Sequence, residues 1–160
     1  MEKLRDFYYQ ADDRITLFMR RNGILFLRIS LGIIFFWFGF LKFFPGLSPA
    51  DQIATETINK LTFRIIGPNV SIIILAVWET LIGIGLLSGK YLRITLLLLF
   101  TQMIGTMTPL ILFPTEVFTR FPYAPTLEGQ YIIKNLVLIS AGLVVGATVR
   151  GGRIVEETES

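Results

Sequence analysis

Glu79 is the residue of this sequence whose position most calls for a chemical explanation. It follows Trp78 near the middle of the apolar segment VSIIILAVWETLIGIGLLS, residues 70–88. If this segment is a membrane-spanning helix, the carboxyl group lies too deep to reach water at either end. It must then be protonated or paired with a cation inside the protein. Two interpretations remain open: a carboxylate that accepts protons or binds a ligand, and a protonated carboxyl group that hydrogen-bonds between helices.

Four more polar residues are candidates to act with Glu79. Gln102 lies at a similar depth in another apolar segment, where we favour a hydrogen bond between helices as its role. Lys134 and Asn135 lie about one turn inside the last apolar segment, and Lys42 lies at the end of the first, in WFGFLKFFPG. We favour Lys134 as the cation that reaches inward to Glu79. We place Lys42 at the rim, where an interfacial anchor is its default role.

The composition excludes several kinds of chemistry. The chain contains no Cys and no His, which rules out thiol redox chemistry and the usual zinc and haem ligands. The acidic residues are few and scattered, so we expect neither a metal site nor catalytic residues. The formal net charge is +3, and the charges lie at the ends of apolar segments. Orientation in a membrane explains this charge better than binding to nucleic acid does.

Four long apolar segments predict an all-α membrane protein, a four-transmembrane-helix bundle that forms a single integral membrane domain over residues 1–160. Each segment is long enough as a helix to cross about 30 Å of hydrocarbon. Because the lipid offers no hydrogen bonds to the backbone, these segments must be helices and not isolated strands. We expect the spans at about residues 24–44, 70–88, 92–113 and 131–149.

Two interfacial amphipathic helices are expected outside the spans. One precedes the first span, where apolar residues recur at helical spacing over Leu4–Met19. The other lies in the connection between the first two spans, on the membrane surface. Ser48 would be its N-cap, Pro49 its first helical residue and Asp51 the acidic residue of its first turn, with Gly67–Pro68 as its stop.

The remaining connections are predicted from their turn residues. The short sequence GKY at residues 89–91 indicates a tight turn between antiparallel helices. Thr108–Pro109 should bend the third span near its end. The proline-rich and aromatic connection over Pro114–Gln130 is expected to form an ordered flap at the interface. Gly142 and Gly146 form a small-residue pattern typical of close helix packing.

The positive charges predict the orientation of the bundle. Lys and Arg gather before the first span, in the tight turn and after the fourth span, and cytoplasmic segments carry such an excess. We therefore expect both termini in the cytoplasm and the two long connections outside. Arg28, near the cytoplasmic end of the first span, should be a snorkelling anchor. The other residues counted are Lys3, Arg5, Arg14, Arg20, Arg21, Lys90, Arg93, Arg150 and Arg153.

This orientation places the polar candidates in the outer half of the bundle, with Glu79 and Gln102 at its floor. The inner half holds little more than small residues. We infer a cavity that opens outward, or toward the outer leaflet, and that is closed toward the cytoplasm. Trp37 and Trp78 are candidates to line this cavity, and packing in the core explains both of them at least as well.

Four segments, taken together and in order, resemble a known family. LRISLGIIFFWFGFLKFFPGLSPA, VWETLIGIGLL, TPLILFP and GQYIIKNLVLISAG look like the YkgB-like family, which includes RclC-like reactive-chlorine-resistance proteins and belongs to the broader DoxX-like group. The resemblance covers roughly residues 24–150. It implies a four-helix, multi-pass protein of the bacterial inner membrane. DoxX relatives are associated with quinone-linked redox systems and oxidative-stress defence.

The resemblance also implies site residues. The family's tryptophan–glycine–lysine pattern, its carboxylate in the second helix and its lysine–polar pair in the fourth map, in this order, to Trp37, Gly39, Lys42, Glu79, Lys134 and Asn135. Relatives can carry an acidic residue at the last of these positions. The neutral Asn135 departs from that pattern, so the resemblance implies no local lysine–carboxylate pair at this position.

Three functions are compatible with these residues. The first is a binding protein that holds a lipophilic small molecule, a quinone or a lipid, and serves envelope or oxidative-stress defence. The second is a small transporter or proton pathway that uses Glu79, and the third is a membrane anchor subunit of a quinone-linked redox complex. We favour the first, and we expect no independent catalytic activity and no cofactor beyond such a bound quinone or lipid. Membrane lipids are the expected partners, nucleic acid is not, and a homo-oligomer or a redox partner protein is left open.

Overall fold

The computed structural model describes residues 2–48 and 51–152. Pro49, the predicted first residue of the second amphipathic helix, and Arg153 lie outside these residues. The helices and strands, in chain order, are α1 (Glu2–Leu41), α2 (Asp51–Leu61), α3 (Pro68–Ser88), α4 (Leu92–Met107), α5 (Pro109–Leu112), α6 (Pro114–Val117), β1 (Phe118–Arg120), β2 (Ala124–Pro125) and α7 (Leu127–Ala147).

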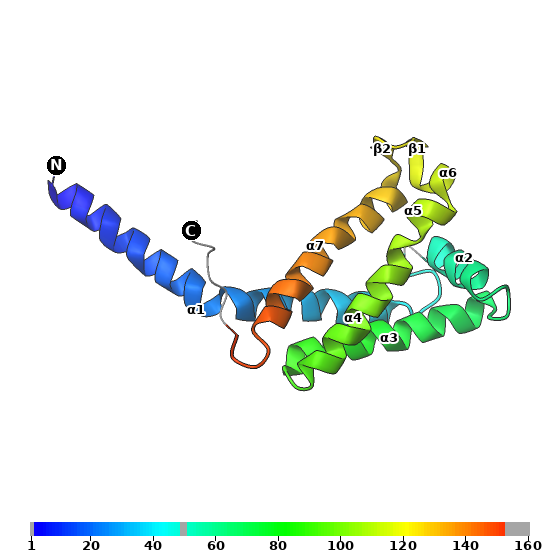
Figure 1. Ribbon diagram of the computed structural model, residues 1–160, viewed down its shortest axis with the longest axis horizontal. Coiled ribbons are helices and arrows are strands. Elements are labelled where there is room, and N and C mark those ends of the chain that lie inside the picture. Colours follow the sequence, from blue (N-terminus) through cyan, green and yellow to red (C-terminus); the bar gives the residue numbers. More distant parts are fainter. Residues whose placement is uncertain (1, 49–50, 153–160) are drawn as a thin grey trace, which may run out of the picture.

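Within the described residues, four helical segments are long and apolar enough to cross a membrane, which confirms the prediction of an all-α, four-span bundle. They are α1, α3, α4 together with α5, and α7. In Figure 1, α1 and α3 run side by side, and α4 and α7 cross them obliquely. The tight turn at residues 89–91 is confirmed, because Gly89 and Tyr91 both adopt left-handed backbone angles and reverse the chain between α3 and α4.

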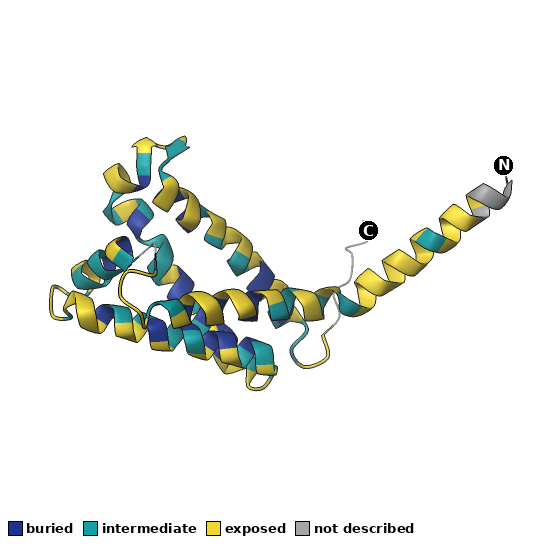
Figure 2. Cartoon of the chain, turned by 180° about the vertical axis from the view of Figure 1, so that it is seen from behind, coloured by how far each residue is buried: buried dark blue, intermediate teal, exposed yellow. Residues whose placement is uncertain are grey.

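The first helix differs from its prediction. The amphipathic helix expected before the first span is not a separate element, because α1 continues without a break from Glu2 to Leu41. No proline interrupts it, and Gly23 alone lowers helix stability by only about 1 kcal/mol. The side-chain amide of Asn22 donates a hydrogen bond to the carbonyl oxygen of Phe18 at 3.0 Å. The first half of α1 therefore extends away from the bundle, almost entirely exposed (Figure 2).

The α1–α3 pair is the closest contact of the bundle, and two glycines permit it. A Cβ atom added at Gly39 would lie 2.6 Å from the backbone nitrogen of Thr80, and one added at Gly83 would overlap the backbone of Phe36. Each glycine therefore lets one helix backbone rest directly on the other. The predicted pair Gly142 and Gly146 faces side chains of α4 at ordinary or slightly tight distances, so its packing is looser.

The third span is interrupted where the sequence predicted a bend. Pro109 has no N–H group, so it cannot donate to the carbonyl oxygen of Gly105. The hydroxyl group of Thr108 donates to that oxygen at 2.6 Å, and the backbone N–H of Thr108 donates to it at 3.2 Å. The freed acceptor is thus satisfied inside the protein, as lipid surroundings require. The chain continues as α5 in a new direction (Figure 1).

The two long connections meet at one end of the bundle, which we call the α2 end. α2 lies between α3 and α5, and not apart from the spans as a surface helix would (Figure 1). Its Ile53 and Thr57 are buried, and Ile53 joins Val117 and Ile132 in a small apolar cluster. Protein therefore covers at least part of the apolar face of α2, and its position on the membrane surface stays a prediction.

The connection between α5 and α7 is ordered, as predicted. After α6, the strands β1 and β2 form a short antiparallel hairpin. Thr126 then caps α7, because its hydroxyl oxygen accepts a hydrogen bond from the N–H group of Gly129 at 3.2 Å. This flap and α2 together close the α2 end of the bundle.

Candidate functional site

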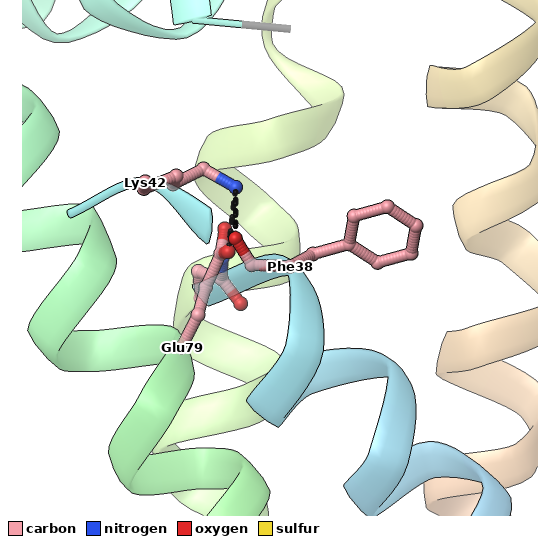
Figure 3. Close-up of polar contacts among 4 residues, drawn as sticks. Phe38, Lys42 and Glu79 are labelled. Atoms are coloured by element: carbon pink, nitrogen blue, oxygen red, sulfur yellow. Dashed lines mark hydrogen bonds and ion pairs between the residues drawn. The ribbon is translucent and has the colours of Figure 1, made fainter. Parts of the chain in front are cut away.

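Glu79 is paired with Lys42. The Nζ atom of Lys42 donates to Oε2 of Glu79 at 2.7 Å, and only 9% and 11% of the two side chains are exposed (Figure 3). It is the single ion pair among the residues that the structure describes. Because both charges are removed from water, neither can be left alone without a large penalty.

The local sequence explains why Lys42 can reach so deep. Lys42 follows directly after the end of α1, and its Nζ atom also lies 3.4 Å from the carbonyl oxygen of Phe38, one turn earlier (Figure 3). Gly39 lies on the same side of α1, and a Cβ atom there would lie 2.7 Å from Cβ of Glu79. Because Gly39 has no side chain, the backbones of α1 and α3 approach closely. The aliphatic part of the Lys42 side chain then spans the remaining distance to Glu79.

Gln102 binds the second oxygen of the Glu79 carboxylate. Its Nε2 atom donates to Oε1 of Glu79 at 2.7 Å, which confirms the predicted hydrogen bond between helices. One residue earlier on α3, the indole nitrogen of Trp78 donates to the carbonyl oxygen of Leu98 at 3.1 Å. Trp78 thus packs in the core between α3 and α4, beside the polar cluster. The Oε1 atom of Gln102 is buried and has no hydrogen-bond partner among the described residues.

Asp51 is a further buried polar group near this end of the spans that the sequence did not reveal. It is the first residue of α2, which packs against α3, the helix that carries Glu79. Its Oδ1 atom is buried without a hydrogen-bond partner in the described part of the chain. From the sequence, Asp51 was explained as an acidic residue that favours the start of a helix. No sequence signal shows that α2 turns this residue toward the spans.

Three predicted site residues are not part of this cluster. Lys134 does not pair with Glu79, which corrects our expectation: its side chain is exposed, and its Nζ atom lies 5.5 Å from the ring centre of Tyr131. The reason is the packing order, because α3 contacts α1, α2 and α4, whereas α7 packs against α1, α4 and the flap. Asn135 is half-buried on the same helix. Trp37 is 63% exposed and lies on the face of α1 away from Phe35 and Gly39, so it does not line an internal site.

An apolar groove lies elsewhere, between α4, α5 and α7. It has a volume of about 430 Å³. Gln102 points away from it, because residues two positions apart on a helix, such as Gln102 and Ile104, face nearly opposite directions. The groove and the polar cluster are therefore separate features on two sides of α4. The groove is lined by Phe100, Met103, Ile104, Met107, Thr108, Ile111 and Ile139.

The DoxX family profile matches residues 23–113 of the chain, a range that contains Lys42, Asp51, Glu79 and Gln102. Neither a curated protein nor a solved structure matches it. The matched range includes the membrane half of α1 and all of α2 to α5, but not the flap or α7.

Proposed function

The chain belongs to the DoxX family, and from this premise we propose that it is a membrane protein that binds a lipophilic small molecule, a quinone or a lipid. We place it in the YkgB-like, RclC-like branch of the family, in the bacterial inner membrane, with both termini in the cytoplasm. Its role in this proposal is envelope or oxidative-stress defence. In this orientation, the α2 end of the bundle faces outward.

The observation that carries this proposal is the groove between α4, α5 and α7. Its volume of about 430 Å³ lies within the range of small-molecule sites, which is roughly 300–1,000 Å³. Six of its seven lining residues are apolar, and Thr108 is the polar one. Met103 and Met107 have flexible side chains that adapt to an apolar ligand of irregular shape. A ring or an acyl chain suits such a lining better than a charged metabolite does.

The position of the groove supports a ligand that arrives from the lipid. Ile104 and Ile111 line the groove and are also strongly exposed on the surface of α4 and α5. In a bilayer this surface faces the hydrocarbon, so a lipophile enters sideways without crossing water. The ligand-binding role that we expected for Glu79, Gln102 and Lys42 does not extend to this groove.

The test is to identify what copurifies with the protein when it is extracted with its surrounding lipid. We expect mass spectrometry to detect a quinone or a particular lipid that is enriched over the bulk membrane extract. The variant Ile104→Trp should lower this enrichment several-fold, because the indole fills the groove. Leu97→Trp is the matched control, since Leu97 lies two turns earlier on α4, is 66% exposed compared with 72% for Ile104, and does not line the groove.

Two results would contradict the proposal. One is a preparation in which no lipophile is enriched over the bulk extract. The other is equal enrichment in the Ile104→Trp and Leu97→Trp variants, which would place the bound molecule outside the groove.

A further inference from the structure

We propose that two copies of this chain associate in parallel through the first half of α1, as a short coiled coil outside the membrane. The contact surface is one apolar side of the helix, which we call the α1 stripe. This association goes beyond lipophile binding and does not depend on it, because the groove lies on α4, α5 and α7. The α1 stripe consists of Tyr8, Ala11, Ile15, Phe18, Asn22 and Leu25.

The first argument is the spacing and the exposure of the α1 stripe. Its members follow one another at alternating steps of three and four residues, which is the spacing of the a and d positions in a coiled coil. Tyr8, Ile15 and Phe18 are 67%, 57% and 56% exposed in the single chain. A contiguous apolar surface of this kind marks a site of interaction, because water alone covers it poorly.

The second argument weighs a protein partner against the membrane surface as the cover of the α1 stripe. α1 is one unbroken helix through Gly23, and its first half extends away from the bundle (Figure 1). To lie flat on the membrane, this half would have to turn sharply and lose backbone hydrogen bonds. Residues 2–13 also contain four acidic and two basic residues, and anionic lipid surfaces repel such a segment. A protein partner therefore fits the stripe better than lipid does.

The third argument is Asn22, the amide in the middle of the α1 stripe. An amide pressed against an apolar cover leaves polar groups without hydrogen bonds, which is costly. The side-chain amide of Asn22 donates one N–H group to the carbonyl oxygen of Phe18 at 3.0 Å. Its second N–H group and its Oδ1 atom suit an identical amide. In a symmetric parallel pair, Asn22 of the second copy lies directly opposite, so the stripe fits a second copy of this chain.

A second α1 helix can lie along the α1 stripe without meeting α3. The guanidinium group of Arg28 contacts the end of α3, at Leu86 and Gly89. Residues seven positions apart lie nearly on one side of a helix, so Arg21 marks the same side of α1 outside the bundle. Asn22 follows Arg21 by one residue, and the stripe at this level is therefore turned by about 100° from the α3 side.

The charges beside the α1 stripe permit parallel pairing. In a parallel coiled coil, each g residue lies beside the e residue of the following heptad in the other helix. None of these pairs brings two like charges together. The stripe spans less than three heptads, but the shared membrane fixes the parallel orientation and raises the effective concentration of the two helices. The pairs across the interface are Phe7 with Asp12, Arg14 with Met19 and Arg21 with Phe26.

Cysteine cross-linking of the full-length protein in liposomes tests the proposal. The chain contains no cysteine, so one introduced cysteine reports on its own surroundings alone. Ile15→Cys lies in the α1 stripe. Leu17→Cys is the matched control, since Leu17 is 53% exposed compared with 57% for Ile15 and faces nearly the opposite direction. With the protein diluted in excess lipid, oxidation should yield several-fold more disulfide-linked dimer in Ile15→Cys than in Leu17→Cys.

The mass of the protein, extracted with its surrounding lipid, provides a second measurement that needs no cysteine. We expect a dimer for the unmodified protein and for Leu17→Asp. Ile15→Asp should be a monomer, because pairing would place two carboxylates against each other. Both positions are exposed, so thermal unfolding of the bundle should be the same in the two variants.

Three results would overturn the proposal. A monomeric unmodified protein would assign the α1 stripe to the membrane surface instead. Equal cross-linking of Ile15→Cys and Leu17→Cys would show that the two copies do not meet through this side of α1. A dimer that persists in Ile15→Asp would place the contact between the copies elsewhere in the chain.

Discussion

Lys42 and Glu79 are 37 residues apart in the sequence, and their side chains form a buried ion pair with a distance of 2.7 Å between Nζ and Oε2. The pair joins the end of α1 to the middle of α3. A shift of one helix along the other by a single turn, about 5.4 Å, would break it. The pair therefore fixes the register of the two helices that pack most closely, besides contributing to the polar cluster.

Removal of Lys42 should destabilise the protein strongly. Loss of one partner of a buried pair costs about 3–5 kcal/mol, because the other charge remains without compensation. We expect Lys42→Met to lower the free energy of unfolding in detergent or bicelles by an amount of this order. The double variant Lys42→Met/Glu79→Gln should recover most of the loss. Lys134→Met is the control, and it should have little effect because Lys134 is exposed. Equal losses in the two lysine variants would contradict the assignment of Lys42 as the partner.

A methyl group at Gly83 should separate α1 from α3. The added Cβ atom would overlap the backbone of Phe36, which cannot move aside as a flexible side chain could. Such overpacking costs about 1–3 kcal/mol. Gly105→Ala is the matched control, since nothing lies within 4 Å of its added Cβ atom, and alanine favours the helix by about 1 kcal/mol. The midpoint of thermal denaturation should therefore fall for Gly83→Ala and rise for Gly105→Ala. A shift of both midpoints in the same direction would contradict the close contact of α1 and α3.

The two tryptophans should respond differently to a quencher in the lipid. Trp37 is 63% exposed on the outer face of α1, whereas Trp78 packs in the core and donates to Leu98. The chain has two tryptophans, so Trp78→Phe and Trp37→Phe each leave one fluorophore. Brominated lipids should quench Trp37 much more than Trp78. Trp78→Phe should also lower stability by about 1–2 kcal/mol through the lost hydrogen bond. Similar quenching of both residues would show that Trp37 is not on the lipid face.

Arg28 should act as a cap for α3 and not only as an anchor in the membrane surface. Its guanidinium group donates to the carbonyl oxygen of Leu86 at 2.9 Å and lies against Gly89, which ends α3. Arg28→Met leaves that carbonyl group without its donor, at a cost of about 1–3 kcal/mol. Hydrogen exchange at residues 86–91 should then become faster. Arg20→Met, at an exposed position of the same helix, should leave this exchange unchanged; if it accelerates exchange equally, the cap is not the cause.

The sequence predicts the depth of a residue well, because hydropathy locates the spans. Glu79 and Gln102 were expected at similar depth, and they do form a hydrogen bond. The choice between Lys42 and Lys134 could not be made in this way. The partner of Glu79 depends on which helices pack against α3. Gly39 and Gly83 permit the close packing of α1 on α3, and this packing is visible only in the folded structure.

Amphipathic patterns were informative in the same limited way. They identified α2 and the first half of α1 as helices with an apolar face. They could not show whether lipid or protein covers that face, because both are apolar. The burial of Ile53 against Val117 and Ile132, and the burial of the Oδ1 atom of Asp51, therefore emerged only from the folded chain.

The unbroken course of α1 has a mechanical consequence. Its 40 residues extend about 60 Å, roughly twice the thickness of the hydrocarbon layer, and the second half is fixed to α3. The first half is therefore a lever arm about 30 Å long, and a change of 10° in the tilt of the span moves its tip by about 5 Å. A small rearrangement at the Lys42 end would thus be amplified at the opposite side of the membrane, where a distance probe on the arm could record it.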